Sequence, residues 1–252
     1  MLLQDKAVIV TGAARGIGKV YAQGIAEAGG RVAVSDILDG EETVEEIRKA
    51  GGEATYVRAD VSDEKSVEAL AEAVHSRFGR IDGLVNNAAI FADIRYCPFD
   101  EITVEEWDAV MAVNVKGVWL ASKAVYPYMK AQGSGKIVNI ASGTPFKGNP
   151  NFAHYTVSKG AVVTLTRVLA RSMGKDGICV NCVGPGLTRS ESLQAAREAE
   201  LDEEEAHMLH TRAIPRSETP DDLVGAIVFF LSGGADFIAG QTLMVDGGSY
   251  MK

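Results

Sequence analysis

Cysteine is scarce in this chain of 252 residues, which has three: Cys97, Cys179 and Cys182. An odd and low count argues against a fold held together by disulfides. Cys179 and Cys182 match a C-x-x-C pattern, but they fall within an expected strand over residues 178–183. Side chains three positions apart on a strand point to opposite faces, so the two thiols should diverge. The four histidines show no ligand pattern with the cysteines either, and we expect no metal site.

Basic charge and long apolar runs are also in short supply. Lysine and arginine number 25 against 34 acidic residues, which gives a net charge of −9. An acidic chain without a basic cluster is a poor candidate for binding nucleic acid or an anionic membrane. No run approaches the ~18 apolar residues that span a bilayer, and the apolar run at residues 7–10 is too short for a signal peptide. We therefore expect a cytoplasmic protein.

What the chain does contain is a regular alternation of two patterns. Short apolar runs rich in β-branched residues predict strands, and stretches with helical periodicity separate them. The expected strands are residues 7–10, 31–35, 54–59, 81–85, 136–141, 178–183 and 241–245. This alternation predicts an α/β fold of the Rossmann type, a doubly wound, seven-stranded parallel sheet with helices on both faces. The sequence shows no linker or repeat, so residues 1–252 should form a single domain.

Three of the expected helices have notable features. Ser62 is a candidate N-cap for a helix over residues 64–78. Asn114 should bend the long helix over residues 104–131, because its side chain competes for backbone hydrogen bonds. The helix that follows Ser190 is strongly acidic and weakly apolar, which suggests a flexible flap at about residues 190–212. A static surface helix is the alternative.

A glycine-rich turn follows the first expected strand and opens the first expected helix. Its glycines are Gly12, Gly16 and Gly18. They would let the backbone approach a pyrophosphate, which the amides at the helix N-terminus would bind. Asp36 ends the second expected strand, where a carboxylate accepts hydrogen bonds from the adenosine ribose and repels a 2′-phosphate. No cation follows, since the next residue is Ile37, although Arg15 could partly offset Asp36; the pattern favours NAD over NADP.

Tyr155 and Lys159 lie four positions apart in an expected helix over residues 152–173, so they share one face. A nearby cation favours the phenolate and lowers the pKa of a tyrosine, which can then act as an acid or a base. Alone, the pair is explained more simply as part of an ordinary amphipathic helix. Its context favours chemistry, because the glycine turn, Asp36 and Ser142 each follow an expected strand, and such strand ends meet at one edge of a parallel sheet.

With these pieces in order, the chain resembles the short-chain dehydrogenase/reductase family over nearly its whole length. The motifs that carry the resemblance are Thr11-Gly12-x-x-x-Gly16-x-Gly18, Asn86-Asn87-Ala88-Ala89, Asn114, Ser142, Tyr155-x-x-x-Lys159 and Pro185-Gly186. Ala89 stands where the family usually has glycine, and Ser190 where it usually has threonine. The resemblance implies an NAD-dependent alcohol dehydrogenase, in which a hydride moves between the nicotinamide and a substrate carbon.

The resemblance also implies roles for individual residues. Tyr155 is the implied acid and base, Ser142 polarises the substrate oxygen, and Lys159 lowers the pKa of Tyr155 and binds the nicotinamide ribose. Asn114 is implied to hold a water that links Lys159 to solvent. The residues expected to contact NAD are Gly12, Arg15, Gly16, Ile17, Gly18, Asp36, Ile37, Asp60, Val61, Asn87, Ala88, Tyr155, Lys159, Pro185, Gly186, Thr188 and Ser190.

The substrate pocket is expected to be aromatic and apolar, which suits a hydrophobic, cyclic or aromatic secondary alcohol or ketone. Its expected walls are Phe91, Ile94, Tyr96, Thr144, Phe146, Asn149, Phe152, Met208 and Leu209. Two alternatives stay open. One is a 3-oxoacyl thioester (acyl-carrier-protein) reductase that uses NADPH, which Asp36 disfavours, and the other is a dinucleotide-binding regulatory protein without catalysis. The resemblance also implies a homotetramer.

Overall fold

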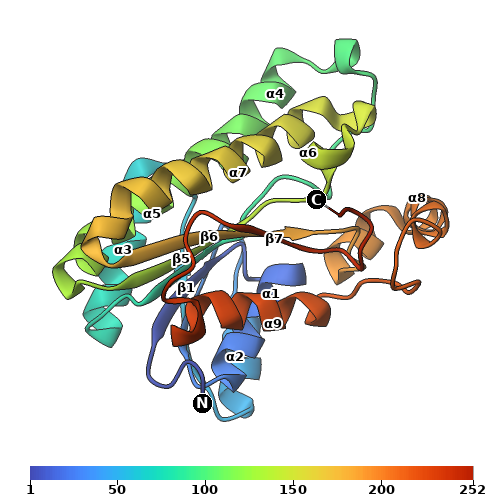
Figure 1. Ribbon diagram of the computed structural model, residues 1–252. Helices are drawn as coiled ribbons and strands as arrows, with labels where there is room; N and C mark the ends of the chain where they lie inside the picture. Colours follow the sequence, from blue (N-terminus) through green and yellow to red (C-terminus); the bar gives the residue numbers. More distant parts are fainter. Residues whose placement is uncertain (252) are drawn as a thin grey trace.

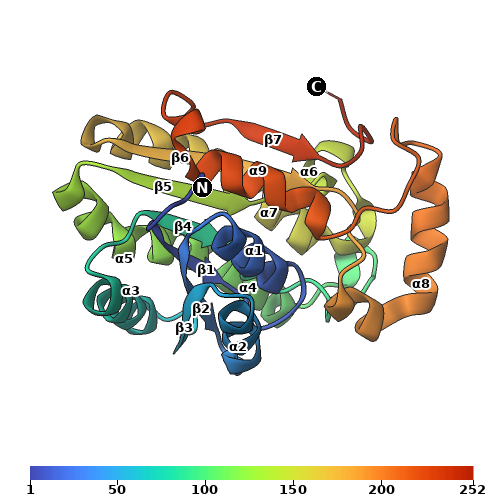
Figure 2. The same ribbon diagram turned by 90° about the horizontal axis from the view of Figure 1, so that it is seen from below.

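The computed structural model describes residues 1–251, and it leaves the side chains of residues 196–201, 203, 204 and 207 outside the description. Within the described chain, seven strands form one sheet in the order β3-β2-β1-β4-β5-β6-β7, and every neighbouring pair is parallel. Figure 1 shows the sheet from the side, and Figure 2 labels each of its strands. The strands are β1 (Ala7–Thr11), β2 (Arg31–Asp36), β3 (Glu53–Arg58), β4 (Gly83–Asn86), β5 (Gly135–Ile140), β6 (Ile178–Pro185) and β7 (Thr242–Val245). The predicted α/β fold class and parallel sheet are thus confirmed.

Helices cover both faces of the sheet. They are α1 (Gly16–Glu27), α2 (Glu41–Lys49), α3 (Glu64–Phe78), α4 (Val104–Met111), α5 (Gly117–Gln132), α6 (Thr144–Lys147), α7 (Ala153–Met173), α8 (Glu191–Leu209) and α9 (Asp221–Leu231). α1 and α9 bury Tyr21, Ile25 and Leu223 in the core on one face, while α3, α5 and α7 bury side chains such as Leu70 and Met129 on the other (Figures 1 and 2). Burial on both faces explains why the strands are continuous apolar runs. None of the described helices is both long enough and apolar enough to cross a membrane.

The strand order reverses between β1 and β4. β1 pairs with β2 on one side and with β4 on the other, so the connections that leave β1 and β4 run to opposite faces of the sheet. Such a divergence opens a crevice at the carboxyl edge, which is the usual ligand site of an open parallel sheet. Gly12, which follows β1, and Asn87 and Ala88, which follow β4, lie in the wall of a cavity at this edge.

The long helix expected over residues 104–131 is interrupted. A π-helical segment, Ala112–Lys116, joins α4 to α5, and Asn114 is fully buried at its centre. A π segment adds a residue to one turn and locally displaces the helix, and such bulges are frequent at functional sites. The distortion expected at Asn114 therefore takes the form of a π bulge.

One local prediction is wrong. The N-cap of α3 is Asp63, whose carboxylate accepts a hydrogen bond from Lys65 N at 3.0 Å. Ser62 does not cap the helix, because its hydroxyl donates to Asp60 Oδ1 at 2.7 Å. The segment between β5 and α7 contains the one-turn helix α6, for which the sequence analysis gives no expectation because it is too short to show periodicity.

α8 lies where the flap is expected. Ser190 is its N-cap and accepts a hydrogen bond from Leu193 N at 3.3 Å. Arg189, just before the helix, forms ion pairs with Asp202 and Glu205 on it. Two other residues of its acidic run, Glu203 and Glu204, lie outside the described side chains. The flexibility of this segment stays a prediction.

Candidate active site

A cavity of about 1000 Å³ opens at the carboxyl edge of the sheet. All the residues predicted to contact the cofactor line it, and so does Ser142. Its volume is at the upper end of the range for small-molecule sites, as a site for a dinucleotide and a substrate together requires. Of the four residues predicted to be catalytic, only Asn114 lies outside the wall.

The glycine-rich turn is shaped by positions that leave no room for a side chain. Gly12 has a φ of +66°, and a Cβ built on it would lie 2.7 Å from the Cα of Ala88. A Cβ on Gly18 would overlap the carbonyl oxygen of Gly12. Asn87 braces the turn, since its Nδ2 donates to the carbonyl oxygens of Thr11 and Gly12 at 3.0 and 2.9 Å. This cradle at the N-terminus of α1 fits a pyrophosphate, which the helix dipole and the first amides attract.

Asp36 ends β2 in the wall of the cavity, where the sequence predicts it. Its Oδ2 accepts a hydrogen bond from Ala14 N at 3.1 Å, and its Oδ1 accepts one from Leu38 N at 3.0 Å. These two amides fix the orientation of the carboxylate, while each oxygen keeps a lone pair for a further donor. The hydroxyls of a ribose can supply those donors, so this end of the cavity fits an adenosine.

α7 brings Tyr155 and Lys159 together in the cavity. The Nζ of Lys159 lies 5.7 Å from the ring centroid of Tyr155 and donates to Ile140 O at 2.8 Å. Lys159 is only 4% exposed, and burial lowers its pKa to about 8. The rings of Phe91 and Phe152 pack against Tyr155 at centroid distances of 4.6 and 5.8 Å. The pair predicted from the four-residue spacing is therefore formed and largely shielded from water.

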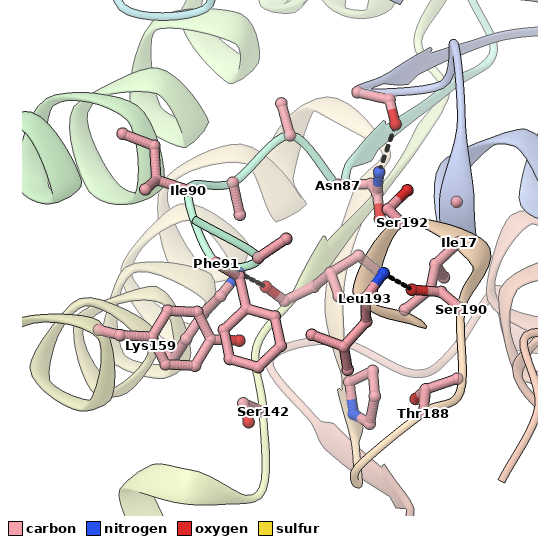
Figure 3. Close-up of a pocket in the computed structure, with 18 of the residues that line it drawn as sticks. Ile17, Asn87, Ile90, Phe91, Ser142, Lys159, Thr188, Ser190, Ser192 and Leu193 are labelled. Atoms are coloured by element: carbon pink, nitrogen blue, oxygen red, sulfur yellow. Dashed lines mark hydrogen bonds between the residues drawn. The ribbon is translucent and has the colours of Figure 1, made fainter. Parts of the chain in front are cut away.

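Ser142 follows β5 and faces the same hollow as Phe91 and Lys159 (Figure 3). Thr144, at the start of α6, donates both its backbone N–H and its Oγ1 hydroxyl to Ser142 Oγ, each at 3.2 Å. A hydroxyl oxygen has two lone pairs, and both are occupied here. The proton of Ser142 is thus left to donate to an oxygen in the cavity.

Asn114 acts on the site from behind its wall. Its Oδ1 accepts a hydrogen bond from Ile90 N at 2.8 Å, and its Nδ2 donates to Ile90 O at 3.2 Å and to Ser158 Oγ at 3.1 Å. The amide therefore clamps the loop after β4 onto α7, next to Tyr155. This geometry gives the side chain a positioning role; the water relay that the family resemblance implies stays a prediction.

The segment after β6 rests on Glu218, which the sequence analysis missed. The Oε1 of Glu218 accepts hydrogen bonds from Thr188 Oγ1 at 2.8 Å and from Gly186 N at 3.2 Å. Burial raises the pKa of Glu218 to about 7, although the hydrogen bond from Thr188 and the charge of Arg212, 3.4 Å from its Oε2, act in the opposite direction. Because the Thr188 proton is already committed, its hydroxyl can only accept from a ligand.

The wall beyond Tyr155 mixes aromatic and apolar residues with polar ones, and three of the residues predicted to line it lie elsewhere. The predicted residues that do line it are Phe91, Tyr96, Thr144, Asn149, Phe152 and Met208. Ile94 is buried behind the wall, and Phe146 stacks on Tyr250 with 4.9 Å between centroids. Leu209 also lies outside the lining, whereas Lys147, which was not predicted, is part of it.

The cysteines and histidines form no metal site in the described part of the chain. Among the side chains described there, no three His, Cys, Asp or Glu residues are grouped so that they could hold a metal ion. Cys179 and Cys182 are both free thiols on β6, the first partly exposed and the second buried. Their different burial agrees with side chains that point to opposite faces.

Comparisons with known proteins agree with this geometry. A family model described as enoyl-(acyl carrier protein) reductase matches residues 12–250. An uncharacterised oxidoreductase of Thermotoga maritima is 42% identical over 253 residues, 99% of each chain. The 3-oxoacyl-[acyl-carrier-protein] reductase FabG of Staphylococcus aureus (strain Mu50) is 38% identical over 249 residues, 98% of each chain. A crystal structure from Beutenbergia cavernae, provisionally an NAD(P)-dependent gluconate 5-dehydrogenase with NADP at low occupancy, is 39% identical with a TM-score of 0.90, covering 98% of this chain and 97% of that one.

The doubly wound sheet, the cradle at its carboxyl edge and these relatives define a nicotinamide-dependent oxidoreductase. The chain belongs to the short-chain dehydrogenase/reductase family. Its relatives differ in the substrates for which they are named, so the substrate has to be argued from the cavity of this chain.

Proposed function

We propose that this protein transfers a hydride between NAD(H) and a hydrophobic, cyclic or aromatic secondary alcohol or ketone. The proposal depends above all on one observation: Ser142, Tyr155 and Lys159 share a single cavity with the glycine-rich cradle and Asp36. When bound, the nicotinamide supplies the hydride chemistry. The protein itself holds the substrate carbon in place and transfers the proton to or from the substrate oxygen.

Tyr155 exchanges that proton in this proposal. The ammonium of Lys159, 5.7 Å from the ring centroid, favours the phenolate and so makes Tyr155 a better acid near neutral pH. Ser142 donates its proton to the same substrate oxygen and stabilises the negative charge that develops there during reduction. Asn114 contributes by clamping Ile90, which keeps the loop after β4 in place beside the reacting atoms.

Thr188 and Ser190 are complementary to the carboxamide group of the nicotinamide. Thr188 can only accept a hydrogen bond, because its proton goes to Glu218. Ser190 is the reverse case: its Oγ accepts from Leu193 N (Figure 3), and its proton remains to be donated. A carboxamide offers an N–H to the first and a carbonyl oxygen to the second, so this pair would fix the orientation of the nicotinamide ring.

Asp36 supports NAD as the cofactor. Its carboxylate is held in the wall by the amides of Ala14 and Leu38, where it can accept from a ribose diol and would repel a 2′-phosphate. Ile37 offers no compensating charge, and Arg15 is the cation at this end of the cavity. We place Asp60 and Val61, which also line this end, beside the adenine.

A second candidate is an NADPH-dependent 3-oxoacyl thioester (acyl-carrier-protein) reductase. The 38% identity to a FabG from Staphylococcus aureus favours it, whereas Asp36 argues against NADPH. A third candidate, a regulatory protein that binds a dinucleotide without catalysis, would have no need for Ser142, Tyr155 and Lys159 together in one cavity.

We also propose a cytoplasmic homotetramer, with residues 1–252 as one domain and α8 as a flap. β7 forms an edge of the sheet and leaves Leu243 exposed, and Trp119 on α5 and Val168 on α7 are exposed too. Apolar side chains in such positions are suited to burial between subunits. Light scattering after size-exclusion chromatography tests the assembly directly.

The reaction is tested by following reduced cofactor with a panel of benzylic, cyclic and polyol secondary alcohols, each with NAD and with NADP. Wild-type protein should turn over a cyclic or aromatic alcohol with NAD, and Tyr155→Phe should abolish turnover while NADH still binds. Activity on polyols alone would overturn the substrate class, and activity with NADPH and an oxoacyl thioester alone would favour the second candidate. Full activity in Tyr155→Phe would refute the mechanism.

A further inference from the structure

Lys147 is a cation in the cavity wall that the proposed chemistry does not use. It ends α6, the one-turn helix that begins two residues after Ser142, so it enters the cavity from the side of the catalytic serine. Two other cations lie in the described wall: Arg15 belongs to the glycine-rich turn, and Lys159 is held beside Tyr155. Lys147 is therefore the cation in this part of the wall that a substrate can reach.

A directed chain of hydrogen bonds holds the ammonium. Lys147 Nζ donates to Ser249 Oγ at 2.5 Å, and Ser249 Oγ lies 3.1 Å from Thr211 Oγ1. Thr211 Oγ1 donates to Met208 O at 2.8 Å, so Ser249 has to be the donor in the middle bond. Both hydroxyl protons are then committed, while two N–H groups of Lys147 remain for a ligand.

The C-terminal segment that carries Ser249 is itself fixed. The carboxylate of Asp246 accepts hydrogen bonds from Gly248 N at 3.0 Å and from Tyr250 N at 2.9 Å. Tyr250 in turn stacks on Phe146, the neighbour of Lys147 on α6. The ammonium is thus held in place before a ligand arrives, which lowers the entropy cost of binding one.

The charge of Lys147 is incompletely compensated. Among the described side chains, no carboxylate lies within ion-pair distance of its Nζ, whose polar contact is to Ser249. Although much of the side chain is exposed, shielding of the ammonium from water lowers the pKa of Lys147; Asp246 and Glu218 act in the opposite direction, and Arg212 adds to the decrease. An anion at this point would gain a direct partner in a partly desolvated cavity.

We propose that Lys147 is a specificity-determining residue that binds a carboxylate on the substrate, at the end remote from the carbon that exchanges the hydride. This proposal rests on the proposed function and narrows its substrates to ring-bearing hydroxy acids and oxo acids. One ammonium with two open N–H groups suits a singly charged carboxylate. A phosphate is usually held by several donors, and Asp93, elsewhere in the cavity wall, disfavours a dianion more than a singly charged carboxylate.

The same hydrogen bonds also have a purely structural explanation. They connect α6 to the C-terminal end of α8 through Ser249, Thr211 and Met208, and they could serve only to fasten that helix. Ser249→Ala separates the two roles, because it breaks the chain and keeps the ammonium. Lys147→Met removes the charge at a similar side-chain length, and Lys147→Arg keeps the charge.

The experiment is isothermal titration calorimetry on protein saturated with NADH, using cyclohexanecarboxylate and its neutral isostere cyclohexanecarboxamide. Wild-type protein should bind the carboxylate about tenfold more tightly than the amide, which corresponds to about 1.4 kcal/mol. Lys147→Met should bind the carboxylate and the amide about equally tightly, while Lys147→Arg and Ser249→Ala should keep most of the preference for the carboxylate. The preference should also weaken with added salt, since it is electrostatic.

The proposal would be overturned if wild-type protein bound the two probes equally or bound neither, or if the preference for the carboxylate persisted in Lys147→Met. An equal loss of that preference in Ser249→Ala would also overturn it, because it would show that the hydrogen-bond chain only fastens α8. Failure of the proposed function is seen separately, as the absence of NADH formation from 4-hydroxycyclohexanecarboxylate and 4-methylcyclohexanol alike. If both are turned over, the ratio of their kcat/KM values should fall about tenfold in Lys147→Met.

Discussion

Lys159, the buried lysine of the site, should lower the free energy of unfolding of the cofactor-free protein. Lys159 is 4% exposed, its ammonium donates to Ile140 O, and burial lowers its pKa from 10.5 to about 8. Methionine has a similar length and no charge, so Lys159→Met removes the desolvated cation with little change in packing. We expect this substitution to stabilise the protein in the absence of cofactor and to abolish catalysis.

The size of the expected stabilisation follows from the pKa of Lys159. The decrease of the Lys159 pKa from 10.5 to about 8, at 1.36 kcal/mol for each pH unit, corresponds to roughly 3 kcal/mol of destabilisation by the charged form. The substitution also leaves Ile140 O without its partner, which costs about 1 kcal/mol. Lys159→Met should therefore raise the free energy of unfolding at pH 7 by about 2 kcal/mol.

The stability difference between Lys159→Met and the wild type should depend on pH in a defined direction. Below pH 8 the lysine is charged in both the folded and the unfolded chain, so the whole cost is present. Between pH 8 and 10.5 the folded chain has released the proton while the unfolded chain still holds it, so the wild type becomes more stable as the pH rises. The advantage of Lys159→Met should thus be largest at pH 7 and disappear above pH 10.5.

Urea denaturation of cofactor-free protein at pH 7, 9 and 10 measures this difference. Lys159→Arg is the matched control, since it keeps a cation in the same place and should not be stabilised. A Lys159→Met protein that is less stable than the wild type at pH 7 would refute the argument. So would an advantage of the same size at pH 7 and pH 10, because it would show that charge is not its source.

Three further predictions concern Asn114, Gly18 and the N-cap of α3. Asn114→Ala leaves both backbone groups of Ile90 unpaired, and urea denaturation should show a loss of about 2 kcal/mol; an unchanged midpoint would contradict the clamp. Gly18→Ala places a methyl group against the carbonyl oxygen of Gly12, and fluorescence titration should show at least about tenfold weaker NADH binding, whereas Gly225→Ala, which meets nothing within 4 Å, should bind normally. Asp63→Ala should cost about 1 kcal/mol as the loss of an N-cap, and Ser62→Ala less; the reverse order would restore Ser62 as the cap.

The cofactor half of the cavity was predictable because it is built from strand ends. Gly12, Asp36 and Asn87 each come within a few residues of a strand that the apolar runs identify. In a parallel sheet the carboxyl ends of all strands meet at one edge, so finding the strands also locates the residues that follow them. The four-residue spacing of Tyr155 and Lys159 likewise predicted that these two side chains lie together in the cavity.

Prediction from the sequence failed in two situations. In one, two neighbouring residues could play the same structural role; in the other, the residues in contact lie far apart in the sequence. Ser62 and Asp63 can both cap a helix, and the choice depends on a hydrogen bond from Ser62 to Asp60 that no pattern indicates. Thr188 meets Glu218 30 residues away, and Lys147 meets Ser249 at a separation of 102. Neither pairing leaves a periodic signal, so the supports of the nicotinamide and substrate ends were missed.

The two halves of the cavity also differ in how much change they tolerate. In the cofactor half, a single added carbon at Gly18 overlaps the backbone of Gly12, and backbone cannot move without disturbing the sheet. In the substrate half, Lys147, Ser249 and Thr211 are joined by side-chain hydrogen bonds, each worth only about 1 kcal/mol. Substitutions there can alter the charge and shape of the wall without unfolding the sheet, so a chain of this family can keep its hydride chemistry while its substrate changes. That asymmetry is the physical reason to look for substrate choice at α6 and the C-terminal segment.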